Sequence, residues 1–406
     1  MKPLAAILAA GISVAWSPQP WPWHLIQAAL LLWAAWLAVR GQLSLRLSPW
    51  LAALIAGALW PWLQVVSGVS VYAGATHEAR LVWTAWLAAY VIADSAVRRD
   101  ERARRWMLAA ITLFSIALAF VAILQRFTAG GRVFWIFQSG YETGQMGPWV
   151  YDNQYAGFVL LVLPIALWHA RGWTFAGPAL LVASVFVSGS LAGSVLVVGE
   201  AFGVLMLRAS RNELPVAMTV RRVAAVGVLA AAMLVVTGWD ALALKLERRE
   251  PLRIRNELSR STLAMARDRP WMGWGLGTWS AAYPAYAHFD DGAFDNQAHN
   301  DWLQWLAEGG VPFFAVMLLL AAGAVGAGWR TGWAMGLGFV LVHCLIEYHF
   351  QERPIFGAVF FTIAALTRRP LISIRTEPET EAGAPEDSPA AGRTRRGGPW
   401  RSSNMD

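Results

Sequence analysis

The sequence predicts an all-α polytopic membrane protein, with about twelve transmembrane helices and a large extracytoplasmic loop between helices nine and ten. Three observations lead to this fold class. The 406 residues are 57% hydrophobic and 15% charged, with a mean hydropathy of +0.43, which is too apolar for an ordinary soluble enzyme. Many of the 24 tryptophans lie at the ends of apolar runs, where an interfacial belt would place them. Arginines cluster in the short connections between those runs.

Twelve apolar runs are long enough to span a bilayer, or nearly so, although several fall short of the roughly 20 residues that a full span needs. They centre on residues 4–16, 24–39, 49–66, 80–97, 106–124, 153–170, 174–188, 191–207, 223–237, 311–329, 331–349 and 355–367. The first run has the length of a secretory signal. Residues 17–23 (SPQPWPW) are a poor cleavage region, however, and a second apolar run follows at once, so we expect a retained helix.

These runs divide the chain into four regions. Residues 1–237 hold helices one to nine, residues 238–310 form the extracytoplasmic loop, and residues 311–369 hold helices ten to twelve. Residues 370–406 are rich in Pro, Gly, Glu and Ser, cannot bury a core, and are predicted to form a disordered cytoplasmic tail.

Arginine placement predicts the orientation of the helices. With the N-terminus inside, every even-numbered connection is cytoplasmic and contains arginine, as the positive-inside rule requires. These arginines are Arg40, Arg46, Arg98, Arg99, Arg102, Arg104, Arg105, Arg171, Arg208, Arg211, Arg221, Arg222 and Arg330. The net charge of +7 therefore needs no nucleic-acid partner. The outer loop also holds eight basic side chains between Lys245 and Arg269. They fit an anionic lipid-linked substrate, or reflect only that long loops escape the rule.

The loop begins with a predicted amphipathic helix after Pro251, able to lie along a membrane surface. Its apolar positions are Ile254, Leu258 and Met265, and its charged positions are Arg253, Glu257, Arg260 and Arg267. Glu257 is at helical spacing from both Arg253 and Arg260, whereas Arg255 has no local carboxylate. An unpaired guanidinium at headgroup depth suits a phosphate.

The loop ends in AHNDWLQWLAEGG, with a helix start near Asp301 and a stop signal at Gly309, Gly310 and Pro312. His299 is expected near this helix start, facing inward. Histidine titrates near neutral pH, so a histidine here can accept a proton from a hydroxyl nucleophile.

Two segments of the loop, RPWMGWGLGTWSAAYPAY and AHNDWLQWLAEGG, resemble the O-antigen ligase and O-antigen polymerase superfamily of bacterial membrane glycosyltransferases. YDNQYAGFVLLVLPIAL at residues 151–167 supports the resemblance more weakly. The resemblance implies glycan transfer from undecaprenyl diphosphate to an acceptor hydroxyl on the outer, periplasmic face of the plasma membrane. It implies no nucleotide sugar, metal or other cofactor. The partners would be the lipid-linked glycan donor, a glycolipid, glycan or protein acceptor, and membrane lipids.

The resemblance also assigns residues. The family's essential loop histidine falls on His299, next to Asn300, and its loop arginine falls on Arg255. The family commonly has an arginine where SGSLAGS places Leu191, so Arg80 or Arg126 is predicted to supply a second diphosphate contact. Arginines would hold the diphosphate leaving group, His299 would face the acceptor, and a single displacement would invert the sugar carbon. The supporting residues Tyr283 and Tyr286 would stack on sugar or anchor the loop at the interface.

Several other features stay open at this stage. Glu200, and His343 with Glu347 at i and i+4, are ionisable groups in apolar runs and therefore candidates by default, unless they pair with one another or with Arg353. The acids Asp290, Asp291 and Asp295 are more typical of a solvated loop than of a metal site. GWGLGT follows no strand, which argues against a dinucleotide motif.

Three alternatives to a ligase remain. A polymerase or a protein O-oligosaccharyltransferase would share these motifs, because acceptor choice depends on loop shape. A lipid-linked glycan flippase or solute transporter would have a similar number of helices, but transporters tend to place polar sites at the midplane of matching halves. In an export scaffold His299 would be dispensable.

Overall fold

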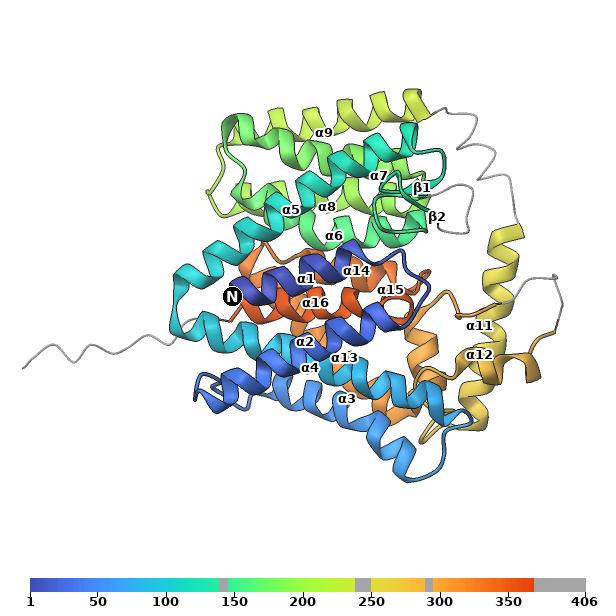
Figure 1. Ribbon diagram of the computed structural model, residues 1–406. Coiled ribbons are helices and arrows are strands. Elements are labelled where there is room, and N and C mark those ends of the chain that lie inside the picture. Colours follow the sequence, from blue (N-terminus) through green and yellow to red (C-terminus); the bar gives the residue numbers. More distant parts are fainter. Residues whose placement is uncertain (139–144, 238–249, 289–294, 369–406) are drawn as a thin grey trace, which may run out of the picture. The chain divides into compact units, whose positions relative to one another are not determined.

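The computed structural model describes residues 1–138, 145–237, 250–288 and 295–368. Part of the predicted loop and the whole predicted tail therefore lie outside the described residues. Helices make up most of the described chain (Figure 1). They are α1 (Lys2–Ser13), α2 (Trp21–Val39), α3 (Pro49–Val66), α4 (Ala73–Arg99), α5 (Glu101–Thr128), α6 (Asp152–His169), η1 (Gly172–Phe175), α7 (Ala176–Ser188), α8 (Leu191–Ser210), α9 (Val216–Thr237), α11 (Glu250–Asp268), α12 (Trp279–Ala282), η2 (Tyr283–Ala285), α13 (Asp301–Thr331), α14 (Gly336–His343), α15 (His349–Glu352) and α16 (Pro354–Leu366). Two short antiparallel strands, β1 (Arg132–Val133) and β2 (Phe137–Gln138), form a hairpin.

Each of the twelve predicted apolar runs overlaps a helix. Among the described residues, six helices are long and apolar enough to cross a membrane: α2, α3, α5, α8, α9 and α13. Helices α1, α7 and α16 are apolar but shorter. A multi-pass membrane protein is therefore supported, while the count of twelve spans stays a prediction.

Two helices are buried around their whole circumference and form the centre of the bundle. In α6, every residue from Gln154 to Leu167 is buried, and α6 packs against α7, α8 and α14. In α16, every residue from Ile355 to Leu366 is buried, mainly against α4. Apolar residues on all sides of a helix are typical of such a position.

The predicted eleventh span differs most from its prediction. Between the end of α13 at Thr331 and the start of α15 at His349, only the eight residues of α14 form an α-helix. The carbonyls of Cys344 and Glu347 accept hydrogen bonds from the N–H of Asp301, at 3.0 and 3.2 Å. The chain leaves the helix after Cys344 because these carbonyls bind the start of α13 instead of the next helical turn.

Several connections that are predicted to lie on the same side of the membrane contact one another. Arg99 donates to the carbonyl of Gly41 at 3.0 Å, which joins the second and fourth connections, and Arg211 donates to the carbonyl of Trp329 at 2.5 Å, which joins the eighth and tenth. Arg269, in the large loop, donates at 3.0 Å to the carbonyl of Val69 in the third connection. These contacts agree with the predicted sides of the connections, while the topology itself stays a prediction.

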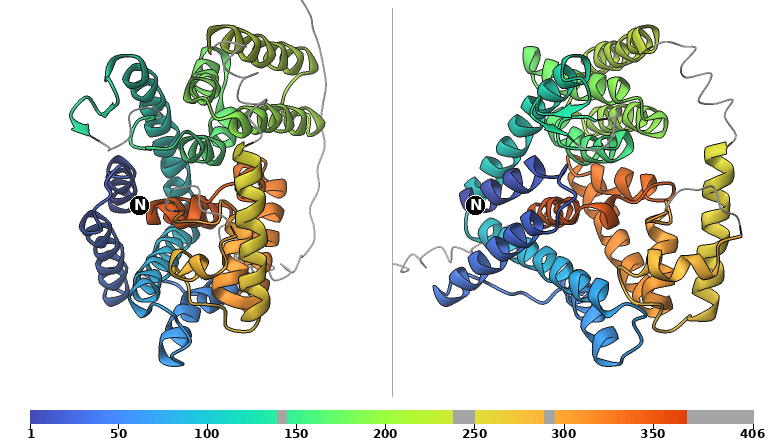
Figure 2. Two further views of the ribbon diagram at one scale, coloured as in Figure 1. Left: turned by 90° about the vertical axis from the view of Figure 1, so that its right-hand side faces the viewer. Right: turned by 45° about the vertical axis from the view of Figure 1, so that its right-hand side comes forward.

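The amphipathic helix predicted after Pro251 is α11, and its apolar face packs on protein. Leu258 and Met265 are fully buried with Trp279 and Tyr283 in a separate apolar cluster of the loop. Both views in Figure 2 show α11 beside α13, and the two helices pack together. This corrects the expectation of a helix lying along the membrane surface, because that face is already covered.

The sequence predicted that a helix ends at Gly309, Gly310 and Pro312, but in the structure α13 kinks there and continues. Gly310 has φ 75° and ψ 177° within α13, and the helix continues to Thr331. A Cβ atom at Gly310 would lie 2.5 Å from the carbonyl oxygen of Trp271, so only glycine allows this close approach. The kink fixes the loop backbone against the start of α13.

Candidate active site

Three polar side chains converge on the carboxylate of Glu347. This glutamate lies between α14 and α15, and its side chain is 4% exposed. One carboxylate oxygen accepts hydrogen bonds from the guanidinium of Arg255 and, at 2.5 Å, from the amide of Asn153. The other oxygen lies 3.9 Å from Nδ1 of His299. We call these four residues the Glu347 cluster.

Arg255 reaches Glu347 because α11 is fixed along α13. The sequence gives Arg255 no local carboxylate, and the structure supplies one from 92 residues away. The Arg255 side chain is 31% exposed, and none of its remaining N–H groups makes a hydrogen bond within the described residues. A guanidinium has five donors, so a carboxylate on one of them orients the group and leaves others for phosphate oxygens.

His299 has an uncommon backbone conformation. Its φ is 51°, in the left-handed region that side chains other than glycine rarely adopt and that costs about 1–2 kcal/mol. Its side chain is 31% exposed, and its ring meets the ring of Tyr348 edge-on at 4.6 Å. Nδ1 has no hydrogen-bond partner in the part of the chain that the structure describes. Such strain is found at functional sites where the surroundings hold it in place.

Contacts at the start of α13 hold the backbone next to His299 in place. Asn300 is the N-cap of α13, and its side chain accepts the N–H of Leu303 at 3.1 Å. The carboxylate of Asp301 accepts the N–H of Phe350 at 3.2 Å, and the N–H of Asp301 binds the α14–α15 connection. Asn300 therefore positions His299 through the backbone.

Asn153 is a site residue that sequence reasoning did not identify. It lies in the first turn of α6, and its side-chain oxygen accepts a hydrogen bond from the hydroxyl of Ser190 at 2.5 Å. Ser190 caps α8 by accepting the N–H of Gly193 at 3.1 Å. The signal that could have identified Asn153 is its position: it is an amide at the start of an apolar helix, within the YDNQ segment that resembles the family.

The other ionisable candidates lie apart from these contacts. His343 hydrogen bonds to His349 at 2.9 Å, so the predicted i, i+4 pair with Glu347 is replaced by a histidine pair. Glu200 is fully buried in α8, and neither carboxylate oxygen has a hydrogen-bond partner among the described residues. No group of three or more His, Cys, Asp or Glu side chains that could hold a metal ion occurs in the described ranges. Asp290 and Asp291 lie outside those ranges.

The two candidate tyrosines differ in exposure. Tyr283 is 6% exposed, and its ring stacks on Trp279 with centroids 4.4 Å apart, so it belongs to the apolar cluster under α11. Tyr286 is half-buried, and its hydroxyl donates to Asp268. Burial and this hydrogen bond raise the pKa of Tyr286 to about 12. Tyr283 has no free face for a sugar, and the outcome for Tyr286 stays a prediction.

The glycine-rich turn GWGLGT encloses a carboxylate. The fully buried carboxylate of Glu308 accepts the N–H groups of Gly277 at 3.0 Å and Trp279 at 2.8 Å. Gln64 binds the same turn by accepting the N–H of Leu276 at 3.0 Å. The turn therefore holds the loop to α3 and α13.

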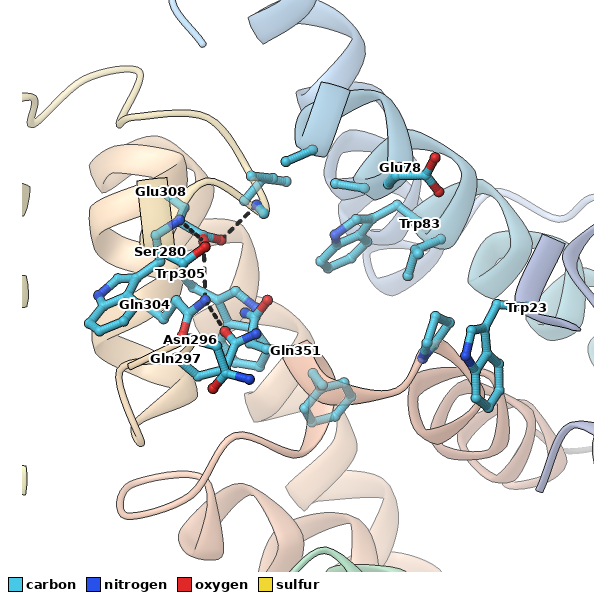
Figure 3. A pocket seen from close by; sticks show the side chains of 18 of the residues that line it. Trp23, Glu78, Trp83, Ser280, Asn296, Gln297, Gln304, Trp305, Glu308 and Gln351 are labelled. Atoms are coloured by element: carbon cyan, nitrogen blue, oxygen red, sulfur yellow. Dashed lines mark hydrogen bonds between the residues drawn. The ribbon is translucent and has the colours of Figure 1, made fainter. Parts of the chain in front are cut away.

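A cavity of about 310 Å³ lies beside this turn. Figure 3 shows Gln297, Gln304 and Glu308 on its α13 side, with Trp23 and Trp83 across from them. Gln297 lies two residues before His299 in the chain. The cavity therefore shares a wall with the segment that carries the candidate base.

Residues 176–318 match the family model for O-antigen ligase. This region of the chain is therefore similar to the O-antigen ligases. The matched region includes Arg255 and His299, whereas Asn153 and Glu347 lie outside it. A search of curated proteins finds no match to the chain.

One position expected from the O-antigen ligase superfamily differs in this chain. Leu191 is the first residue of α8, directly after Ser190, so the expected arginine would stand next to the Glu347 cluster. Arg80 lies over the ring of Trp62 at 4.2 Å, and Arg126 is exposed in the last turn of α5. Neither makes a hydrogen bond or ion pair with the cluster within the described residues, and their diphosphate contact stays a prediction.

Proposed function

We propose that this protein transfers a glycan from undecaprenyl diphosphate to an acceptor hydroxyl on the outer face of the bacterial plasma membrane. The observation that carries the proposal is the convergence of Arg255 and His299 on one buried carboxylate, Glu347. Both residues match the family's loop motif, and the family model covers both. A cation for the leaving group and a base for the nucleophile are what this reaction requires.

Arg255 binds the diphosphate in this proposal. A diphosphate departs readily, so its transfer depends mainly on charge stabilisation and positioning. Glu347 orients the guanidinium through one N–H group, and the remaining donors can bind phosphate oxygens. The phosphates arrive at a guanidinium that is already ordered, which lowers the entropic cost of binding.

His299 accepts the proton of the acceptor hydroxyl. Nδ1 faces Glu347 at 3.9 Å, and Nε2 makes no hydrogen bond within the described residues. Nε2 therefore takes the proton while the acceptor oxygen bonds to the sugar carbon and the bond from that carbon to the phosphate oxygen breaks. Undecaprenyl diphosphate leaves, the sugar carbon inverts, and Glu347 stabilises the imidazolium.

The test is a transfer assay with purified protein, an undecaprenyl-diphosphate oligosaccharide and candidate acceptors, without nucleotide sugar. Wild type should form product, and His299→Ala and Arg255→Ala should lose at least about 100-fold in rate. Arg260→Ala is the matched control, since Arg260 lies on the same helix with its side chain 79% exposed. Equal turnover in all four proteins would remove the proposed site.

The acceptor decides between the related activities. A lipopolysaccharide core as acceptor supports a ligase, a second lipid-linked repeat unit supports a polymerase, and a folded protein supports an O-oligosaccharyltransferase. A flippase would move the lipid-linked glycan across vesicles without forming any new glycosidic bond. Mass spectrometry of the products separates all four.

A further inference from the structure

The cavity beside the glycine-rich turn differs chemically from the Glu347 cluster. Its walls come from the starts of α2 and α4, from the loop before and within α13, and from the α14–α16 connection. Every one of these segments lies at a connection that the arginine pattern predicts to be outside. The cavity therefore opens on the side where the proposed transfer takes place.

Tryptophan rings form much of the cavity wall. Trp23, Trp83, Trp86 and Trp305 line it and are 7%, 4%, 2% and 2% exposed. The N–H of Trp86 already donates to the carbonyl of Pro354 at 2.6 Å, so this ring offers the cavity apolar surface. Rigid, flat aromatic surfaces suit the C–H faces of a sugar ring.

Amide side chains complete the wall. They are Gln27, Asn296, Gln297, Gln304 and Gln351. Gln27 is 4% exposed, and its side-chain oxygen has no hydrogen-bond partner in the described part of the chain. An unpaired buried acceptor costs about 1–3 kcal/mol, so a ligand hydroxyl that donates to it would bind favourably. This atom is an observation independent of the tryptophans.

The charges of the lining select the class of ligand. Glu78 and Glu308 line the cavity, and among the described residues no arginine or lysine does. Glu78 pairs with His24 at 2.7 Å, and the Glu308 carboxylate already accepts the N–H groups of Gly277 and Trp279. A phosphate or an acidic sugar would meet two carboxylates and, within the described lining, no arginine or lysine to bind it, which is unfavourable. A neutral, hydroxyl-rich ring meets no such penalty.

The cavity is linked directly to the candidate base. The side-chain oxygen of Gln304 accepts the N–H of Ala298 at 3.0 Å, one residue before His299. The side-chain nitrogen of Gln304 donates to Gln297 at 2.6 Å and to Glu308 at 3.1 Å. Figure 3 shows Gln304 between Gln297 and Glu308 at the edge of the cavity. A ring held here would therefore lie against the segment that positions His299.

We infer that this cavity binds a neutral sugar ring of a substrate, next to the segment that carries His299. The ligand's source, donor glycan or acceptor glycan, rests on the proposed function, whereas binding itself does not. The ring stacks on the indoles and donates a hydroxyl to Gln27. The site thereby separates the neutral part of the substrates from the anionic part.

The test measures saturation-transfer NMR on methyl glucoside and methyl N-acetylglucosaminide with the full-length protein in lipid nanodiscs. Glycoside detergents are avoided because they carry a neutral sugar. Wild type should saturate at least one of the two glycosides, and inorganic pyrophosphate should not compete. Absence of transfer to both glycosides overturns the inference, as does competition by pyrophosphate.

Two variants locate the binding. Ser280→Trp fills the cavity and should abolish the signal, and Gln27→Met should weaken binding about tenfold through the lost hydrogen bond. Ser210→Trp, at an exposed position of α8, and Thr362→Val, which removes a buried hydroxyl that has no partner among the described residues, are the matched controls. Binding that survives Ser280→Trp overturns the inference.

Transfer kinetics identify the source of the sugar. If the ring belongs to the acceptor, Gln27→Met raises the KM for the acceptor alone, and if it belongs to the donor, it raises the KM for the donor alone. Unchanged KM for both substrates overturns the inference. If the wild type forms no product, the proposed function is contradicted and the inference about the cavity is not. Glycoside binding that persists in Arg255→Ala shows that the cavity binds sugar independently of Arg255.

Discussion

Two buried glutamates, Glu308 within α13 and Glu347 near its start, have different kinds of hydrogen-bond partner. Glu308 accepts two backbone N–H groups from the glycine-rich turn and a side-chain amide, whereas Glu347 accepts an arginine and an amide and faces a histidine. Backbone donors are fixed by the fold, while side-chain donors can turn toward a ligand. The comparison indicates that Glu308 holds the loop in place and that Glu347 organises groups that react.

The largest expected effect is on the transfer rate, and it tests whether Glu347 organises groups that react. Glu347→Ala should lower the transfer rate about 100-fold, because Arg255 and His299 lose the group that positions them. Glu347→Gln should lose less, since its amide oxygen can still accept from Arg255 but carries no charge for the imidazolium. The measurement is kcat and KM in the transfer assay. Glu257→Gln, which changes a carboxylate of α11 that lies 4.0 Å from Arg260, is the control, and a wild-type rate in Glu347→Ala would break the comparison.

The next effect tests the role of Glu308. Glu308→Gln should destabilise the protein by about 1–3 kcal/mol, because a single amide oxygen cannot replace the carboxylate for both backbone N–H groups. Thermal unfolding in nanodiscs measures this, with Glu347→Gln unfolded in parallel. We expect the larger fall in Tm for Glu308→Gln. The reverse order would show that the two carboxylates have exchanged roles.

A smaller effect is expected at Asn153. Asn153→Ala should lower kcat/KM about fivefold, equivalent to the loss of one hydrogen bond to Glu347. Asn153→Asp should be worse, because it places a second carboxylate against the first. Ser190→Ala removes only the indirect contact and should have the mildest effect. Equal rates for Asn153→Asp and wild type would exclude Asn153 from the cluster.

The smallest effect concerns pH at Tyr286. Because the folded-state pKa is raised to about 12, above the ordinary value of 10.0, the neutral hydroxyl is favoured by folding. Its contribution to stability should be complete below pH 10 and lost as the pH rises through about 12. Ultraviolet difference titration of wild type against Tyr286→Phe measures this. Ionisation of Tyr286 near pH 10 would contradict it.

Most of the helices were predictable because apolar periodicity is a local property. Each of the twelve runs overlaps a helix, and α11 begins where Pro251 and the amphipathic pattern indicate. The prediction was wrong where long-range contacts replaced local ones. The turn at Gly310 became a kink because Trp271 packs against it, and the run at 331–349 is interrupted because Asp301 takes its carbonyls.

The residues of the candidate site were likewise predictable where they belong to a local motif and not where they depend on long-range contacts. His299 and Arg255 could be proposed from the loop motif, which lies within one stretch of sequence. Glu347 was only a default candidate and Asn153 was not proposed, because Glu347 contacts Arg255 across 92 residues and Asn153 across 194. Spacing along a chain carries no information about such contacts.

The sequence by itself determined a helical membrane protein that resembles the O-antigen ligase superfamily, with a histidine and an arginine in the loop that carries the resemblance. Hydropathy, charge placement and a local motif suffice for that, since each is read within a short window. Only the tertiary structure decided that Arg255 has a carboxylate partner, that the apolar face of α11 packs on protein, and that a tryptophan-lined cavity adjoins the segment before His299. These features depend on which helices pack together, and packing is set by the whole chain.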